Sequence, residues 1–236
     1  MKLKIIFEDN HLLVVEKPIN MPTQGDNTGD LDLLTFLKKD LKARYEKPGN
    51  VYLGLVHRLD RPVGGVMVFA KTSKAASRLS TQIREGNLEK NYLAVAHGLL
   101  KIKSGRLNNY LIKDCRRNIV TVAPDSTSNA KEARLDYEVI GEKEGMSLLE
   151  IALGTGRSHQ IRVQFAAIGH PLYGDRKYGA QVNRAGEQLA LFAFRLRLQH
   201  PVSKEYLEFK ATPFMTYPWT VFPKLWDVYN PRGLSH

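Results

Sequence analysis

Apolar and polar residues alternate with a period of two along several segments of the chain. The alternation is clearest at residues 133–139, 149–153 and 192–198. This period is typical of strands that bury one face. Short apolar runs bounded by turn residues predict further strands at 5–7, 12–15, 51–56 and 66–70. The segment around Tyr92 also has a strand pattern, with Ala94 and Ala96 on the same face.

A second spacing, close to helical, interrupts the strands at three places. Leucines recur from Leu31 to Leu41, and a helix is expected to begin near Ser73. A third helix is predicted over 158–168, with Ile161, Phe165 and Ile168 on one face. Many strands without regular β-α-β alternation predict an α+β fold, with a mostly antiparallel mixed central sheet flanked by helices and loops. Because no repeat or flexible linker divides the chain, we expect one domain over residues 1–236.

Charge changes this picture more than composition does. The chain has 236 residues, and 35 Lys and Arg against 24 Asp and Glu give a net charge of +11. Such an excess attracts polyanions, although an ordinary basic protein is an equal alternative from charge alone. The single cysteine, Cys115, excludes an internal disulfide and a cysteine-based zinc site. The chain has no apolar run of about 18 residues and no signal peptide, so we expect no membrane contact. We also expect a monomer in the cytoplasm.

The first candidate for chemistry is Asp60, which follows an apolar run and precedes a glycine turn. A carboxylate at a strand end can act as a nucleophile, a base or a metal ligand. The alternative is a turn in which Asp60 only accepts backbone hydrogen bonds, and for an isolated aspartate that alternative is the commoner one.

Two further segments carry candidate side chains. Arg162 lies on the predicted third helix, at the border of its apolar face, where a guanidinium could pair with a carboxylate. Its alternative is a surface arginine on an amphipathic helix. Tyr92 has small neighbours on its strand face, so we expect an accessible ring that could stack on a base. An ordinary half-buried tyrosine is the alternative.

Together these segments closely resemble the RluA family of RNA pseudouridine synthases. The family's H-R-L-D signature is similar to residues 57–60, and its K-x-Y-x-A segment to residues 90–94. Its T-G-R-x-H-Q-I-R helix and G-H-P-x-x-G-D-x-x-Y-G turn are similar to residues 155–162 and 169–179. The resemblance covers residues 5–213 and implies a pseudouridine-synthase fold with an active-site cleft across the sheet.

The chain departs from the family pattern at a few positions. Val63 and Gly64 stand where the family usually has Thr-Ser, which puts contacts of that loop in doubt. Gln164 and Phe192 stand where histidine is frequent, so local hydrogen bonds there are in doubt. The N-terminal S4 module of many relatives is expected to be absent.

The resemblance implies that Asp60 is the catalytic carboxylate, that Arg162 is its counter-charge and that Tyr92 stacks on a flipped uracil. A nucleophilic, a Michael-type and a glycal route all remain open. Arg58 is expected to fill the vacated base stack, with a salt-bridged structural arginine as the equal alternative. The remaining candidates for RNA contact in these motifs are His57, Arg61, Lys90, Arg157, His159 and Gln160. Further basic candidates for phosphate contact are Lys71, Arg84, Arg176 and Lys177.

Isomerisation needs no metal or organic cofactor, and the partner is expected to be a stem-loop of ribosomal or transfer RNA. A non-catalytic RNA-binding module would use the same charges and aromatic rings. A metal-dependent nuclease or phosphatase could instead use Asp60 with His57, His159, His170 and Asp175, although no close pair of ligands supports it.

Overall fold

The computed structural model describes residues 3–223, and these form two compact units. The first unit comprises residues 3–89 and 195–211, and the second comprises residues 90–194 and 212–223. The predicted single domain over residues 1–236 stays a prediction, and its residues 1–2 and 224–236 lie outside the described part.

The first unit is built on an antiparallel sheet. Its strands are β1 (Lys4–Glu8), β2 (Leu12–Lys17), β3 (Gly54–Leu55), β4 (Gly64–Ala70), the end of β10 (Leu191–Gln199), and β11 (Tyr206–Lys210). The order is β1-β2-β4-β10, with β3 paired to β4 and β11 paired to β10. All seven residues of β4 are buried. Strand β4 therefore forms the centre of this sheet, and Asp60 lies in the loop that leads into it.

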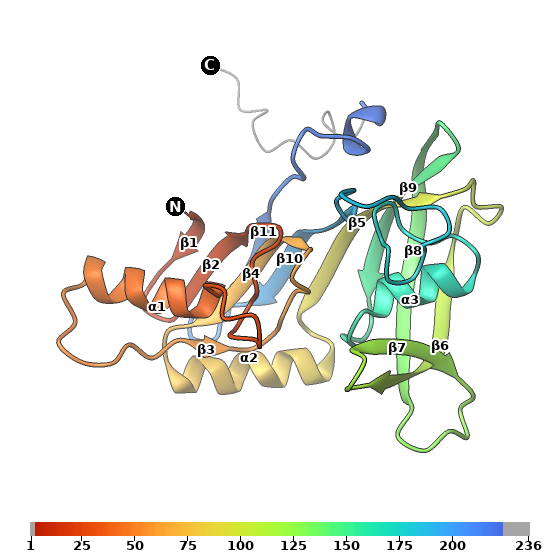
Figure 1. The fold of residues 1–236 in the computed structure, drawn as a ribbon. Helices are drawn as coiled ribbons and strands as arrows, with labels where there is room; N and C mark the ends of the chain where they lie inside the picture. Colours follow the sequence, from red (N-terminus) through yellow and green to blue (C-terminus); the bar gives the residue numbers. More distant parts are fainter. Residues whose placement is uncertain (1–2, 224–236) are drawn as a thin grey trace. The chain divides into compact units, whose positions relative to one another are not determined.

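Two helices accompany this sheet (Figure 1). Helix α1 (Leu33–Arg44) buries three leucines at a helical spacing, Leu33, Leu37 and Leu41. Helix α2 (Ser73–Glu85) packs against β3 and β4. Each helix begins at a side chain that caps its first turn, because Asp32 accepts from the Thr35 amide and Thr72 from the Ala75 amide. Gly86 ends α2 in the left-handed conformation that glycine adopts easily.

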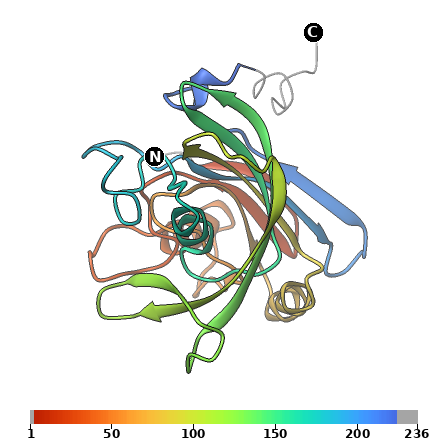
Figure 2. The same cartoon turned by 90° about the vertical axis from the view of Figure 1, so that its right-hand side faces the viewer.

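The second unit has a larger antiparallel sheet and one α-helix. Its strands are β5 (Glu89–His97), β6 (Ser104–Asp114), β7 (Ile119–Ala123), β8 (Lys131–Lys143) and β9 (Met146–Leu153). Their order is β5-β9-β8-β6-β7. Helix α3 (Gln160–Ala167) packs against β6 and β7, and a short 3-10 helix, η1 (Trp219–Val221), follows β11 in the chain. Figure 2 shows α3 end on, with the green strands of this unit curving past it.

Helix α3 is buried on almost every side, which an amphipathic helix would not be. Val163 packs in a core cluster with residues of β6, β7 and β8. Gln164 is fully buried and donates to the carbonyls of Leu107 and Ala133 and to the Asn109 side chain. This amide supplies the hydrogen bonds that the sequence left in doubt at this position.

The predicted α+β class with mostly antiparallel pairing is confirmed, because every strand pair with a described register is antiparallel. Three local predictions need correction. The strand expected over 51–56 is confined to Gly54–Leu55, and the hairpin of β6 and β7 was not predicted. Ile168 is 42% exposed instead of sharing the buried face, because α3 ends before it.

Candidate active site

The loop between β3 and β4 holds Asp60 in a defined turn. The Val63 amide donates to the Asp60 carbonyl over 3.0 Å, and the Leu59 carbonyl accepts the Thr23 hydroxyl over 2.8 Å. Leu59 is buried, Asp60 is half-buried and Arg58 is exposed. A buried apolar residue and two backbone contacts thus fix the loop on both sides of the carboxylate.

Lys17, at the end of β2, is a member of this site that sequence reasoning missed. Its ammonium is fully buried and donates to the carbonyls of Pro18, Met21 and Arg61, at 2.9, 2.6 and 3.1 Å. Burial lowers the pKa of Lys17 to about 7, while the negative charge of Asp60 opposes that shift. The two charges are therefore near enough to interact.

His57 and Arg61, both expected to contact RNA, make contacts inside the first unit. His57 Nε2 accepts the Val68 amide over 3.1 Å, which ties the loop to β4. The Arg61 guanidinium binds the Asp30 carboxylate and donates to the Thr28 hydroxyl over 3.1 Å. These contacts shape the loop around Asp60, and an RNA contact by either residue stays a prediction.

Arg58 differs from these neighbours because its guanidinium is exposed and has no carboxylate or hydrogen-bond partner within residues 3–223. The alternative of a salt-bridged structural arginine therefore finds no counterpart in the described part of the chain. An exposed and unengaged cation next to Asp60 is available to a substrate.

In the second unit, Arg162 is 6% exposed, so the surface-arginine alternative is wrong. Its Nε and one Nη donate to the two carboxylate oxygens of Asp175, each over 2.7 Å. Its guanidinium also lies over the ring of Tyr178, with Cζ 5.2 Å from the centroid. This two-pronged ion pair and the cation–π contact give the guanidinium one orientation.

Asp175 is the most informative residue that sequence reasoning did not assign to this site. It belongs to the G-H-P-x-x-G-D-x-x-Y-G turn, and its Oδ1 also accepts the amides of Lys177 and Tyr178. The buried amide of Asn183 donates to the carbonyls of Leu172, Asp175 and Gly179. The turn is thereby held closed around the carboxylate. Its place in that motif was a sequence signal that could have pointed to it.

Tyr178 connects three segments of the second unit. Its hydroxyl accepts the Val120 amide of β7 over 2.9 Å and is 2.6 Å from His159 Nδ1. The tautomer of His159 sets which of the two groups donates in that bond. His159 is buried and Tyr178 lies against the Arg162 guanidinium. An RNA contact by His159 stays a prediction.

The turn before α3 is anchored to β8. The Gln160 side chain accepts the Arg157 amide and the Thr155 hydroxyl, and it donates to the Arg134 carbonyl. Arg157 Nε donates to the Glu132 carbonyl over 2.8 Å, while the residue as a whole is exposed. Gln160 thus has a role within the turn, whereas Arg157 presents charge at the surface. RNA contacts by either residue stay predictions.

Tyr92 and Lys90 lie two residues apart on β5, so both point to the same face of the strand. Tyr92 is only 7% exposed, so the expectation of an accessible ring is wrong; its backbone pairs with Ile151 in the interior of the sheet. Lys90 is half-buried beside Gly156, and burial lowers the pKa of its ammonium. The predicted pairing of Asp60 with Arg162 joins residues of different units and stays a prediction.

Several other candidate cations already have partners. The Lys71 ammonium binds the Glu8 carboxylate over 2.8 Å, Arg84 donates to the Thr81 hydroxyl, and Lys177 donates to the Asn118 carbonyl. Arg176 is exposed. Within the described chain no three His, Cys, Asp or Glu side chains converge as metal ligands.

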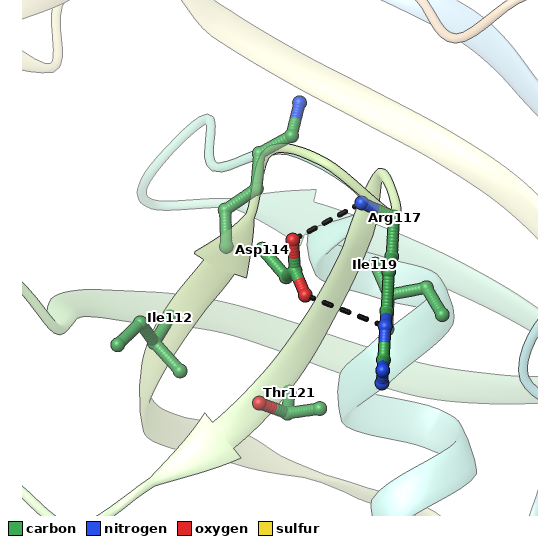
Figure 3. Close-up of a pocket in the computed structure, with 6 residues that line it drawn as sticks. Ile112, Asp114, Arg117, Ile119 and Thr121 are labelled. Atoms are coloured by element: carbon green, nitrogen blue, oxygen red, sulfur yellow. Dashed lines mark hydrogen bonds and ion pairs between the residues drawn. The ribbon is translucent and has the colours of Figure 1, made fainter.

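A hollow of about 290 Å³ lies on the hairpin of β6 and β7 (Figure 3). Its wall includes Asp114, whose carboxylate accepts the Arg117 amide over 3.0 Å. None of the predicted site residues lines it. From residue 3 to residue 223, no helix combines the length and apolarity that a bilayer crossing requires.

The class of this fold is defined by comparison with solved structures. The structure of human RNA pseudouridylate synthase domain containing 4 superposes with a TM-score of 0.75 at 22% identity, covering 89% of this chain and 88% of that one. At this identity the similarity establishes the fold, which is that of a pseudouridine synthase.

Sequence comparison then identifies the family. The family model described as RNA pseudouridylate synthase matches residues 11–167. The RNA pseudouridine synthase YhcT of Bacillus subtilis is 34% identical, over 90% of this chain and 69% of its own length. Ribosomal large subunit pseudouridine synthase C of Vibrio parahaemolyticus is 32% identical, over 88% of this chain and 64% of its own length. Synthase D of Nitrosomonas europaea is 34% identical, over 87% of this chain and 60% of its own length.

The chain belongs to the RNA pseudouridylate synthase family. It is thus an isomerase that acts on RNA and converts uridine to pseudouridine.

Proposed function

We propose that Asp60 is the catalytic carboxylate of this isomerase, with Arg162 as its counter-charge and Tyr92 as the platform for the uracil. The observation that carries the proposal is the family match over residues 11–167, which includes all three positions within their motifs. Isomerisation breaks the bond between ribose and base nitrogen, and an electron-poor sugar carbon develops as in glycoside cleavage. One ionised carboxylate can attack that carbon or stabilise its charge.

The surroundings of Asp60 supply positive charge. The buried ammonium of Lys17 is near enough to interact with the Asp60 carboxylate, and Arg162 would add a second cation in the proposed pair. Asp175 holds the Arg162 guanidinium in one orientation before any substrate binds. A rigid cation suits a catalytic group, because it needs no reorganisation during the reaction.

Base flipping requires something to replace the extruded uridine in the stack. We assign this role to Arg58, since its guanidinium is exposed, next to Asp60 and unengaged within residues 3–223. A planar guanidinium can stack on neighbouring bases and bind phosphate at the same time. Because the Tyr92 ring is covered in the free protein, uridine entry must displace whatever covers it.

For the substrate we propose a stem-loop of ribosomal RNA in preference to transfer RNA. Two of the relatives are named as synthases of the large ribosomal subunit, which favours that RNA class. The net charge of +11 suits a large polyanion. We further propose that the enzyme acts as a monomer in the cytoplasm and uses no organic cofactor.

The test is Asp60→Asn, which keeps the size of the side chain and removes its charge. We expect pseudouridine formation to fall below detection while RNA affinity stays within about threefold, because phosphate contacts supply most of the affinity. Pseudouridines are mapped by carbodiimide modification of ribosomal RNA incubated with each protein. Asp136→Asn, on the exposed face of β8, is the matched control and should remain active. Full activity of Asp60→Asn would contradict the assignment.

A further inference from the structure

Lys90 is a cation without a counter-charge in the described part of the chain. No carboxylate, hydroxyl or carbonyl within residues 3–223 binds its ammonium, although the side chain is half-buried. Two other lysines that are withdrawn from solvent are satisfied: Lys17 by three carbonyls, and Lys71 by the Glu8 carboxylate and the Asp9 carbonyl. Partial desolvation of an unpaired charge costs free energy, so an unsatisfied ammonium at this position needs an explanation.

The position of Lys90 suggests what it binds. Its Nζ lies beside Gly156, where a methyl group on the glycine would come within 3.3 Å of the nitrogen. Gly156 is exposed, so this turn lets another molecule approach both the backbone and the ammonium. Lys90 and Tyr92 share one strand face and lie about 7 Å apart along it, which is close to the distance from a base to its backbone phosphate.

We propose that Lys90 and the turn at Gly156 form a binding site for one RNA backbone phosphate that adjoins the uridine received by Tyr92. This inference rests on the proposed role of Tyr92. Burial lowers the pKa of Lys90 in the free protein, and a bound phosphate would stabilise its charged form. The site supplies both charge and a small residue for close approach, two features that phosphate sites combine.

The expected consequence is a change in the salt dependence of RNA binding. The probe is a fluorescein-labelled oligouridylate, whose affinity is measured by fluorescence anisotropy over a salt series. Each phosphate contact contributes a slope of about 0.7 in log affinity against log salt for a single strand. Lys90→Met should reduce the slope by about that amount and weaken binding about tenfold at low salt. Lys90→Arg should keep the slope.

Two further variants sharpen the test. Lys143→Met removes one exposed charge at the turn between β8 and β9 and should leave the slope unchanged, which controls for net charge. Gly156→Ala keeps the charge but narrows the approach to Nζ, so it should weaken binding with no change in net charge. Lys90→Met should keep or raise the melting temperature, because no partner of the ammonium is lost.

The results distinguish a failure of the phosphate site from a failure of the proposed function. A wild-type slope in Lys90→Met would overturn the phosphate site, and so would full RNA affinity in Gly156→Ala. Pseudouridine mapping with the wild-type protein is run in parallel. Loss of isomerisation in the wild type would refute the proposed function, whereas normal isomerisation with an unchanged slope refutes only the role of Lys90.

Discussion

Among residues 3–223, the Arg162 and Lys17 side chains are both buried and positively charged, and they are satisfied in different ways. Arg162 meets a carboxylate that binds it at two points, so charge is neutralised by charge. Lys17 meets three carbonyl oxygens, which supply partial charges only. The first arrangement makes a rigid pair, and the second leaves an ammonium whose pKa is lowered by burial to about 7.

Asp175→Asn should therefore destabilise the protein strongly. The substitution keeps the shape of the side chain but removes the negative charge that the buried Arg162 guanidinium binds at two points, at a cost of about 3–5 kcal/mol. The free energy of unfolding is measured with urea. Asp136→Asn removes a carboxylate from an exposed pair with Arg106 and should leave the unfolding midpoint nearly unchanged. Equal midpoints for the two variants would show that the buried pair contributes nothing to stability.

Lys17 should give the protein a stability that rises with pH above neutrality. The pKa of Lys17 falls from its ordinary 10.5 in the unfolded chain to about 7 in the folded one. Between these values the unfolded chain binds more protons, so raising the pH favours the folded state by up to about 1.4 kcal/mol per pH unit. Below pH 7 Lys17 is protonated in both the folded and the unfolded chain, so its contribution to the free energy of unfolding no longer changes with pH.

The check is urea unfolding at pH 7 and pH 9 for the wild type and Lys17→Met. The wild type should gain stability over this interval relative to the variant, since the variant lacks the titrating group. The variant should also be less stable at pH 9, because the carbonyls that the Lys17 side-chain nitrogen serves lose their donor. Parallel pH profiles for the two proteins would mean that Lys17 keeps an ordinary pKa.

At the scale of elements, one turn positions the side chains that contact Arg162. The turn from Gly174 to Gly179 places Asp175 opposite Arg162 and Tyr178 against both α3 and β7. Gly174 adopts a φ of +74°, and a Cβ there would lie 2.2 Å from the Gln188 carbonyl oxygen. Only glycine fits this position, because both the conformation and the space exclude a side chain.

Gly174→Ala should consequently shift the whole turn and weaken the Arg162–Asp175 pair. We expect a loss of stability of at least about 2 kcal/mol, since strain and a backbone clash add together. The matched control is Gly145→Ala, which has a φ of +70° but no atom within 4 Å of its Cβ. It should cost about 1 kcal/mol from conformation alone. Thermal unfolding followed by circular dichroism compares the two, and equal losses would argue against the clash.

At the scale of the whole molecule, the chain builds its first unit from two distant segments. Residues 3–89 supply β1 to β4, and residues 195–211 supply the end of β10 and β11. Strand β4 is bordered by β10 in the sheet order. The first unit is complete only after almost all of the chain has been made.

A fragment of residues 1–89 should therefore fail to fold alone. Without β10 and β11, the edge of β4 keeps unpaired backbone groups next to seven residues that are buried in the full chain. We expect aggregation in size-exclusion chromatography and no cooperative unfolding transition, whereas the full chain should be monomeric and cooperative. A monomeric fragment with a sharp transition would show that the four N-terminal strands suffice.

Much of the local structure follows from the sequence, and the failures are instructive. The alternation at residues 133–139 lies within β8, and the leucine spacing identifies α1. The hairpin of β6 and β7 escaped prediction because most of its side chains are exposed or half-exposed, so little apolar periodicity marks it. Backbone pairing of β6 with β8 holds the hairpin in place, and β8 begins eight residues after β7 ends.

The candidate site also has features that the sequence predicts and features that only the tertiary structure fixes. The sequence by itself determined the family, the antiparallel α+β class and the positions of Asp60, Tyr92 and Arg162, because motifs and periodicity are properties of neighbouring residues. Only the tertiary structure decided that Lys17 is buried near Asp60 and that Asp175 binds Arg162. Burial and ion pairing depend on which distant segments surround a side chain, and no local pattern records that.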